Sequence, residues 1–219
     1  MPEEIDIYQT IKTQLTSNGF EHGAKLRAEV LRDEYNCSAS TVREVLFRLS
    51  TVGLVDFQEQ RGFRVPKRCA AKLIELTHMR VLLESEGTVL SMRKGGVLWE
   101  ARLTAAHHQL SHIEKRIHAH GDPSGLIEIW SNSENDFHQT LISDCGSETL
   151  KQMHRRVYAQ FRQQLMVADR QFDFISGNIQ HHAAILDAAL SGDEALTRAK
   201  IHDHLARHLK GDTLASTTG

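Results

Sequence analysis

The chain has 219 residues and a formal net charge of −2, with 40% hydrophobic and 25% charged residues. This composition fits a globular protein of one or two domains, and no apolar run approaches the roughly 18–20 residues that a membrane span requires. The three cysteines lie far apart, which argues against a disulfide framework and against a CxxC metal site. Because the first residues are acidic and do not resemble a secretion signal, we expect a cytoplasmic protein without a membrane partner.

The first 66 residues show three short helical patterns followed by two short strands. The first two helices are predicted from apolar stripes at Ile7, Tyr8, Ile11, Leu15 and at Leu26, Val30, Leu31, Tyr35. A third helix follows a tight turn at Asn36 and ends before Gly53. Residues 54–57 and 63–65 then predict a two-stranded hairpin with a polar tip. Three helices followed by a hairpin are typical of a winged helix-turn-helix domain.

The third helix has one apolar and one polar face. Its apolar residues follow the i, i+3, i+4, i+7 spacing of a buried stripe, at Val42, Val45, Leu46 and Leu49. The other face carries hydroxyls and arginines, which suit contacts with phosphates and base edges near a helix N-terminus. We therefore predict that this helix enters a DNA groove. Acidic and basic residues are balanced over residues 1–68, so the charge permits DNA binding but does not by itself indicate it.

This segment resembles the GntR family of bacterial transcription regulators. The shared motifs are Tyr-x-x-Ile at Tyr8, Gly-x-x-Leu at Gly23, Ser-x-x-x-Val-Arg-Glu-x-Leu-x-x-Leu from Ser38, Gly-Leu-Val at Gly53 and Arg-Gly at Arg61. One position departs from the family pattern, because Ala39 stands where the family usually has an arginine. The departure puts more of the recognition on Arg43, Arg48 and the wing, and it implies an operator that differs from the family's usual one.

The resemblance implies a set of DNA-binding residues on the second and third helices and on the wing. They are Arg27, Ser38, Ser40, Thr41, Arg43, Arg48, Arg61 and Gly62. Ser38 is also the natural N-cap of the third helix, and Ser40 and Thr41 are expected at phosphates rather than at bases. Arg61, at the hairpin tip, is expected in the minor groove. The alternative for each arginine is an exposed side chain that only contacts solvent.

The rest of the chain is predicted to be helical. Pro66 ends the wing, and residues 67–70 read as a linker. Glycine-containing breaks then divide residues 71–210 into about six helices, near residues 70–94, 98–119, 123–143, 147–170, 176–190 and 193–210. Residues 211–219 form a polar tail. The expected fold is mainly α, with a winged helix-turn-helix over residues 1–66 and an antiparallel all-α bundle over residues 71–210.

Four polar residues fall on the apolar stripes of this bundle. Glu134 and His138 share the core face of the third bundle helix, four residues apart, so their side chains converge. His182 lies on the core face of the fifth helix, and His204 on that of the sixth. A buried carboxylate and three imidazoles satisfy one another either through a divalent metal or through direct His–Glu hydrogen bonds. The pattern leaves both interpretations open.

The bundle resembles the FCD domain of the FadR subfamily, and six helices rather than seven resemble its VanR-like branch. The shared motifs are Phe137-His138, His182-x-x-Ile-Leu, Gly192-Asp193 and His204-Leu205. The resemblance implies that Glu134, His138, His182 and His204 hold a divalent metal ion, with zinc expected and nickel or manganese as alternatives. Glu134 stands where the family has Asp or Asn, which leaves the coordination geometry open.

The FCD resemblance also implies a small organic acid effector whose carboxylate completes the metal shell. Arg80 lies on the apolar stripe of the first bundle helix, and its planar guanidinium suits a carboxylate. The alternative is that Arg80 only pairs with Glu84. Tyr158, on the stripe of the fourth bundle helix, is a second candidate effector contact. Its alternative is a core tyrosine whose hydroxyl bonds elsewhere.

These features predict a homodimeric, ligand-responsive transcriptional regulator, with repression as the default. A dimer would place two recognition helices on the half-sites of a palindromic operator in double-stranded DNA. Two alternatives remain. One is a metal-dependent hydrolase fused to a DNA-binding module, in which the Glu/His cluster activates water, although no further base is evident beside it. The other is a DNA-binding protein whose helical domain is purely structural. We assign no catalytic residue.

Overall fold

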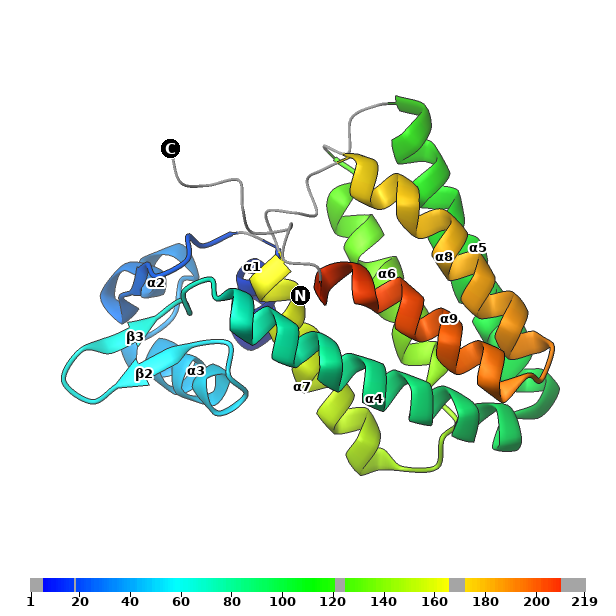
Figure 1. Ribbon diagram of the computed structural model, residues 1–219. Coiled ribbons are helices and arrows are strands. Elements are labelled where there is room, and N and C mark those ends of the chain that lie inside the picture. The colour runs from blue at the N-terminus through cyan, green and yellow to red at the C-terminus, as the bar shows by residue number, and fades with distance from the viewer. Residues whose placement is uncertain (1–5, 18, 121–124, 166–171, 210–219) are drawn as a thin grey trace, which may run out of the picture.

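The computed structural model describes residues 6–17, 19–120, 125–165 and 172–209. A small winged domain lies beside a bundle of long helices (Figure 1). Within these ranges, no helix combines the length and the apolar character needed to cross a membrane. The predicted tail at residues 211–219 lies outside the described residues.

The winged domain contains α1 (Ile7–Thr16), β1 (Lys25–Leu26), α2 (Ala28–Glu34), α3 (Ala39–Thr51), β2 (Asp56–Gln58) and β3 (Gly62–Arg64). Its core is formed by the apolar stripes that the sequence predicted. Ile11 and Leu15 of α1 pack with Val42, Leu46 and Leu49 of α3, and each is at most 1% exposed. The hydrophobic effect therefore holds α3 by one face and leaves the other to solvent.

The predicted hairpin is present as β2 and β3, and a short strand that was not predicted, β1, extends it to a three-stranded antiparallel sheet. The strand order is β1-β3-β2, with Leu26 and Phe57 both opposite Phe63. Leu26 was expected to open the second helix, but it lies in β1, and α2 begins at Ala28. A two-residue strand is too short to show an alternating pattern, and it forms only because β3 supplies hydrogen-bonding partners.

Helix α3 begins and ends as the sequence indicates. The hydroxyl of Ser38 accepts a hydrogen bond from the backbone N–H of Thr41 at 3.0 Å, so Ser38 is the N-cap. Beyond the helix, Gly53 has φ +75, in the left-handed region that favours glycine. A Cβ at Gly53 would lie 2.7 Å from Nε2 of Gln160, a bundle residue. Glycine here serves both the turn and the close approach of the bundle.

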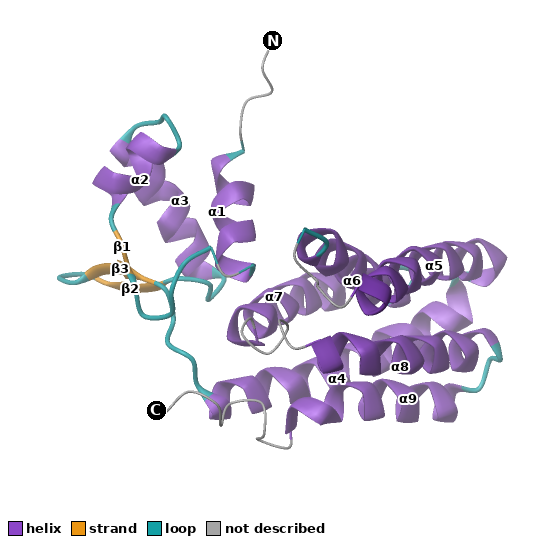
Figure 2. Cartoon of the chain, turned by 90° about the horizontal axis from the view of Figure 1, so that it is seen from above, coloured by secondary structure: helices purple, strands orange, loops and turns teal. Residues whose placement is uncertain are grey.

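The bundle contains α4 (Ala70–Lys94), α5 (Gly96–His120), α6 (Ile127–Leu141), α7 (Glu148–Leu165), α8 (Phe172–Leu190) and α9 (Glu194–Ala206), followed by a 3-10 helix, η2 (Arg207–Leu209). The mainly α prediction is confirmed. α6 is shorter than predicted, and α8 starts at Phe172 rather than at residue 176. The bundle helices pack side by side, with α7 next to the winged domain (Figure 2).

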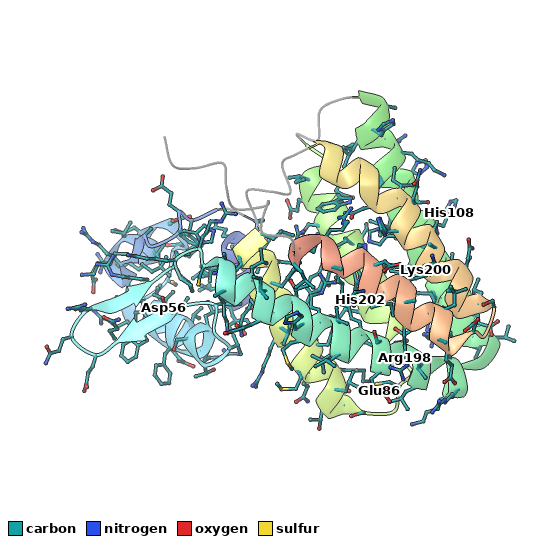
Figure 3. The ribbon with its side chains drawn as sticks, in the orientation of Figure 1. Asp56, Glu86, His108, Arg198, Lys200 and His202 are labelled. Atoms are coloured by element: carbon teal, nitrogen blue, oxygen red, sulfur yellow. The ribbon has the colours of Figure 1, made fainter. Side chains whose placement is uncertain are left out.

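The bundle core is built around Trp99, Trp130 and Phe137, each at most 1% exposed. The outer surface is charged. In Figure 3, Glu86 of α4 and Arg198 of α9 face each other, and the guanidinium Nη2 lies 2.7 Å from Glu86 Oε2. Such exposed pairs contribute little to stability, so apolar packing holds the bundle together.

Helix α7 contacts both domains. Its residue Ala159 belongs to the apolar core of the winged domain. Three glutamines of α7 donate side-chain hydrogen bonds to backbone carbonyls of the winged domain and linker. The pairs are Gln160 to Val52 at 3.0 Å, Gln163 to Leu54 at 2.9 Å and Gln164 to Lys67 at 3.2 Å. These bonds fix the end of α3 and the linker against α7.

Candidate metal centre and nucleic-acid interface

The four predicted metal ligands lie together in the bundle interior. Glu134 and His138 come from α6, His182 from α8 and His204 from α9, and they are 5%, 0%, 0% and 2% exposed. One candidate ligand atom from each residue lies within 4.8 Å of all the others. Ligand atoms about 2.1 Å from one metal ion are at most about 4.2 Å apart. The cluster is therefore close to the size that one ion requires.

The histidines of this cluster retain unused ring nitrogens. His138 Nε2, His182 Nε2 and His204 Nδ1 are buried and have no hydrogen-bond partner within the described ranges. His138 Nε2 lies 3.4 Å from Glu134 Oε1, without hydrogen-bond geometry. Each buried unsatisfied polar atom costs about 1–3 kcal/mol. Direct His–Glu bonds thus leave the cluster unsatisfied, and the residues present fit a metal ion.

Two further carboxylates lie behind the histidines. Glu84 Oε2 lies 2.8 Å from His138 Nδ1, and Glu114 Oε1 lies 3.1 Å from His182 Nδ1. Both carboxylates are 0% exposed, and Glu114 Oε1 also accepts from Trp130 Nε1 at 3.3 Å. Metal-binding imidazoles commonly donate their second N–H to a carboxylate, which fixes the tautomer and the ring orientation. Here that arrangement leaves Nε2 of both histidines available.

Arg80 is buried beside this cluster. Its Nε donates to Glu84 Oε1 at 2.7 Å, so the predicted ion pair with Glu84 is present. Its guanidinium carbon lies 4.8 Å from the ring centre of Tyr158 and 4.6 Å from that of Phe161. Nη2 is buried and has no hydrogen-bond partner among the described residues. The side chain is therefore held in place and still offers one N–H group to an anion.

Tyr158 supports the cluster through Glu134. Its hydroxyl donates a hydrogen bond to Glu134 Oε2. Arg162 Nη1 lies 3.7 Å from the same oxygen. The Tyr158 hydroxyl is thus bonded to a carboxylate of the protein. This arrangement matches the alternative for Tyr158, a core tyrosine whose hydroxyl bonds to a group other than the effector. Glu134 is held from one side by α7 and faces His138 on the other.

Buried charges shift the pKa values of these groups. Burial alone would raise the pKa of the Glu84 carboxyl, but the charge of Arg80 and the bonds from His138 hold it well below its ordinary value. Burial lowers the pKa of His138 and the charge of Glu84 raises it, with a net upward shift. Burial and the neighbouring imidazoles place the pKa of His204 well below its usual range. The low pKa of His204 favours the neutral imidazole that binds metals, and Glu84 draws the Nδ1–H of His138 toward itself, which leaves Nε2 on the side of the cluster.

Sequence reasoning missed several residues of this site. Glu114 lies on an apolar stripe of α5 between Leu110 and Ile117, the same signal that identified Glu134. His154 lies four residues before Tyr158, and its Nε2 is 2.9 Å from Glu84 Oε1. Applying the rule of polar residues on apolar stripes to α5 and α7 would have found both. Arg162 lies four residues after Tyr158 on the same stripe, so the same rule would have found it.

One histidine pair at helical spacing lies outside the cluster. His108 and His112 are exposed on α5, and their rings stack with centroids 6.4 Å apart. His108 and His202 are labelled on the outer surface in Figure 3. The i, i+4 spacing alone does not distinguish these residues from ligands. Exposure distinguishes them, because His108 and His112 face solvent, whereas the three histidines of the cluster are buried.

The predicted DNA-binding side chains are exposed on α3 and on the wing. Ser40, Thr41, Arg43 and Arg48 lie on the solvent face of α3. Arg43 Nη2 is 2.6 Å from Glu29 Oε1 on α2, and the Arg48 guanidinium lies 4.6 Å from the Tyr8 ring centre. Exposed pairs of this kind are worth at most about 1 kcal/mol. Either arginine is therefore released at little cost when phosphate or a base edge replaces its partner.

The remaining predicted DNA contacts flank this helix. Arg27 is exposed directly before α2 and makes no side-chain capping bond. Arg61 is exposed in the turn between β2 and β3, and Gly62 has φ +74. The left-handed glycine gives the wing its tight tip, which carries Arg61 outward.

The winged domain and the bundle each match a known protein family. Residues 5–65 match "Bacterial regulatory proteins, gntR family", and residues 75–207 match "FCD domain". The chain belongs to the GntR family of bacterial transcription regulators, with the FadR-like arrangement of a winged helix followed by an FCD domain. The families and the relatives below are transcriptional regulators rather than enzymes, which removes the hydrolase interpretation.

Named relatives support this membership. The chain is 30% identical to an uncharacterized HTH-type transcriptional regulator, BphR, of Paraburkholderia xenovorans strain LB400, over 85% of this chain and 75% of BphR. It is 25% identical to the HTH-type transcriptional repressor GlaR of Escherichia coli K12, over 92% and 91% of the two chains.

Solved structures share the fold. E. coli McbR/YncC has a TM-score of 0.77 at 18% identity, with 94% of each chain covered. A GntR transcriptional regulator from Rhodococcus sp. RHA1 has a TM-score of 0.75 at 20% identity, with 95% of this chain and 98% of that chain covered. At these identities the likeness concerns the fold alone.

Proposed function

We propose that this GntR-family regulator is a metal-containing repressor whose bundle senses a small organic acid. The observation that carries the proposal is the buried cluster of Glu134, His138, His182 and His204. Its three imidazoles each keep a ring nitrogen without a hydrogen-bond partner in the described part of the chain. A structural His–Glu cluster would have used these nitrogens.

The four cluster residues would hold one divalent ion. Three imidazoles and one carboxylate favour zinc, with nickel and manganese as alternatives. When bound, the ion supplies a Lewis-acidic centre for a carboxylate oxygen. Glu84 and Glu114 keep Nε2 of His138 and His182 directed away from their own carboxylates. The chain thus orients both imidazoles before the ion arrives.

Arg80 is the residue that we assign to the effector. Its ion pair with Glu84 and its stacking on two aromatic rings fix the guanidinium, and Nη2 is still available for a carboxylate. A preorganised planar guanidinium pairs with a carboxylate at a small entropic cost. Tyr158 contributes indirectly, because it holds Glu134 and forms one face of the stack on Arg80.

The DNA partner is proposed to be a palindromic operator bound by a homodimer. The exposed face of α3 would enter the major groove, with Arg43 and Arg48 as candidate base or phosphate contacts. Arg61 at the wing tip would contact the minor groove, while Ser40 and Thr41 contact phosphates. Because a regulator bound to chromosomal DNA acts where the DNA is, we also propose a cytoplasmic location.

Helix α7 is proposed to couple the two sites. One face of α7 carries His154, Tyr158 and Arg162, which contact Glu84 and Glu134. Its other face carries the three glutamines that hold the end of α3 and the linker. A ligand that shifts α7 would therefore move α3. This counts as allostery only when the ligand binds the two arrangements with different affinities. The repressor name of the relative GlaR supports repression as the default.

Elemental analysis of protein purified without added metal tests this proposal. We expect about one divalent ion per chain in the wild type, and its loss in His138→Ala and in His182→Ala. His108→Ala is the matched control, because His108 is an exposed bundle histidine away from the cluster. All three variants should still bind operator DNA in the absence of effector. Full metal occupancy in both cluster variants would show that these residues are not the ligands.

A further inference from the structure

A polar cavity lies between the DNA-binding domain and the bundle. It has a volume of about 290 Å³ and is lined by residues of α1, α6 and α7. Its size is just below the roughly 300–1,000 Å³ of sites for drug-sized ligands, so it suits a small molecule. None of the predicted functional roles uses this cavity as a binding site.

The lining of the cavity is cationic. It includes Lys12, Arg155 and Arg162, and no Asp or Glu is among its described lining residues. Lys12 is half-buried and makes no ion pair within the described part of the chain. Arg155 is exposed and pairs with Glu148 at 2.6 Å, so it contributes only to the rim. The rest of the lining is rich in amides and hydroxyls, including Asn135. Such a set of donors favours an anion.

The floor of the cavity is continuous with the metal centre. Tyr158 and Arg162 line the cavity, and each is 5% exposed. The same two side chains contact Glu134 Oε2 on their other side. A ligand in the cavity thus lies one side chain away from the candidate metal ligands.

The opposite wall of the cavity belongs to the DNA-binding domain. Lys12 lies on α1 beside Ile11 and Leu15, which are buried in the core of the winged domain. Ala159 of α7 packs into that same core, beside the cavity. An anion held by Lys12 and Arg162 would therefore touch both domains at once. Its binding energy depends directly on how the two domains are docked.

We propose that this interdomain cavity binds a carboxylate group of a small organic acid. The carboxylate comes either from the far end of an acid held at the metal centre or from a second acid molecule. The first of these sources rests on the proposed function, whereas the second does not. With either source, the ligand is an acid that places a negative charge beside Lys12. Dicarboxylates should therefore bind more tightly than monocarboxylates of the same length.

Calorimetric titration of the full chain with succinate and with butyrate tests the proposal, because these acids have equal carbon number and differ by one carboxylate. We expect wild-type protein to bind succinate at least tenfold more tightly than butyrate. Lys12→Gln should remove most of that preference, and Lys115→Gln, which changes an exposed lysine of α5, should not. As a second variant, Asn135→Asp places a negative charge in the cavity and should also abolish the preference. Melting curves verify that each variant is folded.

Repeating the titration after metal removal separates the two sources. If the preference for succinate is lost on chelation and in His138→Ala, one acid spans both sites. If it survives chelation but is lost in Lys12→Gln, the cavity binds a separate acid, and the proposal stands even where the metal proposal fails. Unchanged succinate affinity in folded Lys12→Gln and Asn135→Asp would overturn it. Failure of wild-type protein to bind succinate at millimolar concentration would overturn it as well.

Discussion

The side-chain amide of Gln163 donates a hydrogen bond to the carbonyl oxygen of Leu54, 2.9 Å away, across the boundary between the bundle and the winged domain. Leu54 directly follows the turn that ends α3, and Gln163 is adjacent in sequence to Arg162, which lies near Glu134. This bond joins the segment that follows α3, the proposed recognition helix, to the helix that borders the candidate sensor site. The position of α7 therefore sets the position of α3.

Substitution Gln163→Ala should weaken this connection. Gln163 is 1% exposed, and removal of its amide leaves the Leu54 carbonyl without that donor at a cost of about 1–3 kcal/mol. We expect a lower melting temperature and a smaller effector-induced change in operator affinity, with unchanged metal content. Gln152→Ala, an exposed glutamine of the same helix, is the control. An undiminished effector response in Gln163→Ala would remove this bond from the coupling route.

Substitution Gly53→Ala should destabilise the protein for two reasons. Its φ of +75 disfavours a side chain, and the new Cβ would meet Nε2 of Gln160 at 2.7 Å. Gly192→Ala is a matched control, because Gly192 has φ +76 and open space around it. We expect about 1–2 kcal/mol of loss at Gly192 from the backbone alone and a larger loss at Gly53, measured by denaturant unfolding. Equal losses of stability in the two variants would show that the Gln160 side chain moves away from the new Cβ without an energetic cost.

Substitution Glu84→Gln should lower metal affinity although Glu84 is not a proposed ligand. The neutral amide attracts the Nδ1–H of His138 less strongly than the carboxylate does, so it orients the ring less firmly, and loss of such a carboxylate typically costs about 10–100-fold in metal affinity. The dissociation constant can be measured by competition with a chromophoric chelator. Glu86→Gln, an exposed glutamate of the same helix, should change nothing.

Because Glu84 also pairs with buried Arg80, its substitution is expected to destabilise the fold. Glu114→Gln offers a second route, since Glu114 lies behind His182 rather than His138. Wild-type metal affinity in folded forms of both variants would argue that these carboxylates have no part in orienting the ligands.

Substitution Arg43→Ala should weaken operator binding by about tenfold or more, as expected for loss of a base or phosphate contact. The melting temperature should not change, because the side chain is 60% exposed and its pair with Glu29 is a surface pair. Arg32→Ala is the control, since Arg32 is an exposed neighbour of the same Glu29. Equal operator affinity for the two variants, measured by fluorescence anisotropy, would exclude Arg43 from the contact set.

Local patterns predicted much of this molecule. The apolar stripes of α1 and α3 identified the winged-domain core, and the i, i+4 spacing of Glu134 and His138 placed two candidate ligands on one face. The spacing of Arg80 and Glu84 likewise indicated the ion pair that was weighed as the alternative for Arg80. In each of these cases one helix supplies both partners, so its geometry alone sets the result.

The features that were not predicted depend on how elements pack together. Strand β1 exists only because β3 pairs with Leu26. Glu84 was considered only as a partner of Arg80. Its contact with His138 was not predicted, because that contact requires α4 to lie against α6. The three glutamines of α7 read as ordinary polar surface residues, because their partners are backbone carbonyls in another domain. No periodicity in one segment records such contacts.

The bundle site is proposed to control DNA binding through its metal, and one measurement tests this most directly. Operator affinity would be measured by fluorescence anisotropy with metal-loaded wild-type protein and with His182→Ala, each titrated with a panel of small carboxylic acids. We expect at least one acid to weaken operator binding tenfold or more in the wild type and to leave His182→Ala unaffected. An operator affinity that no acid changes, or an equal response in His182→Ala, would contradict the account.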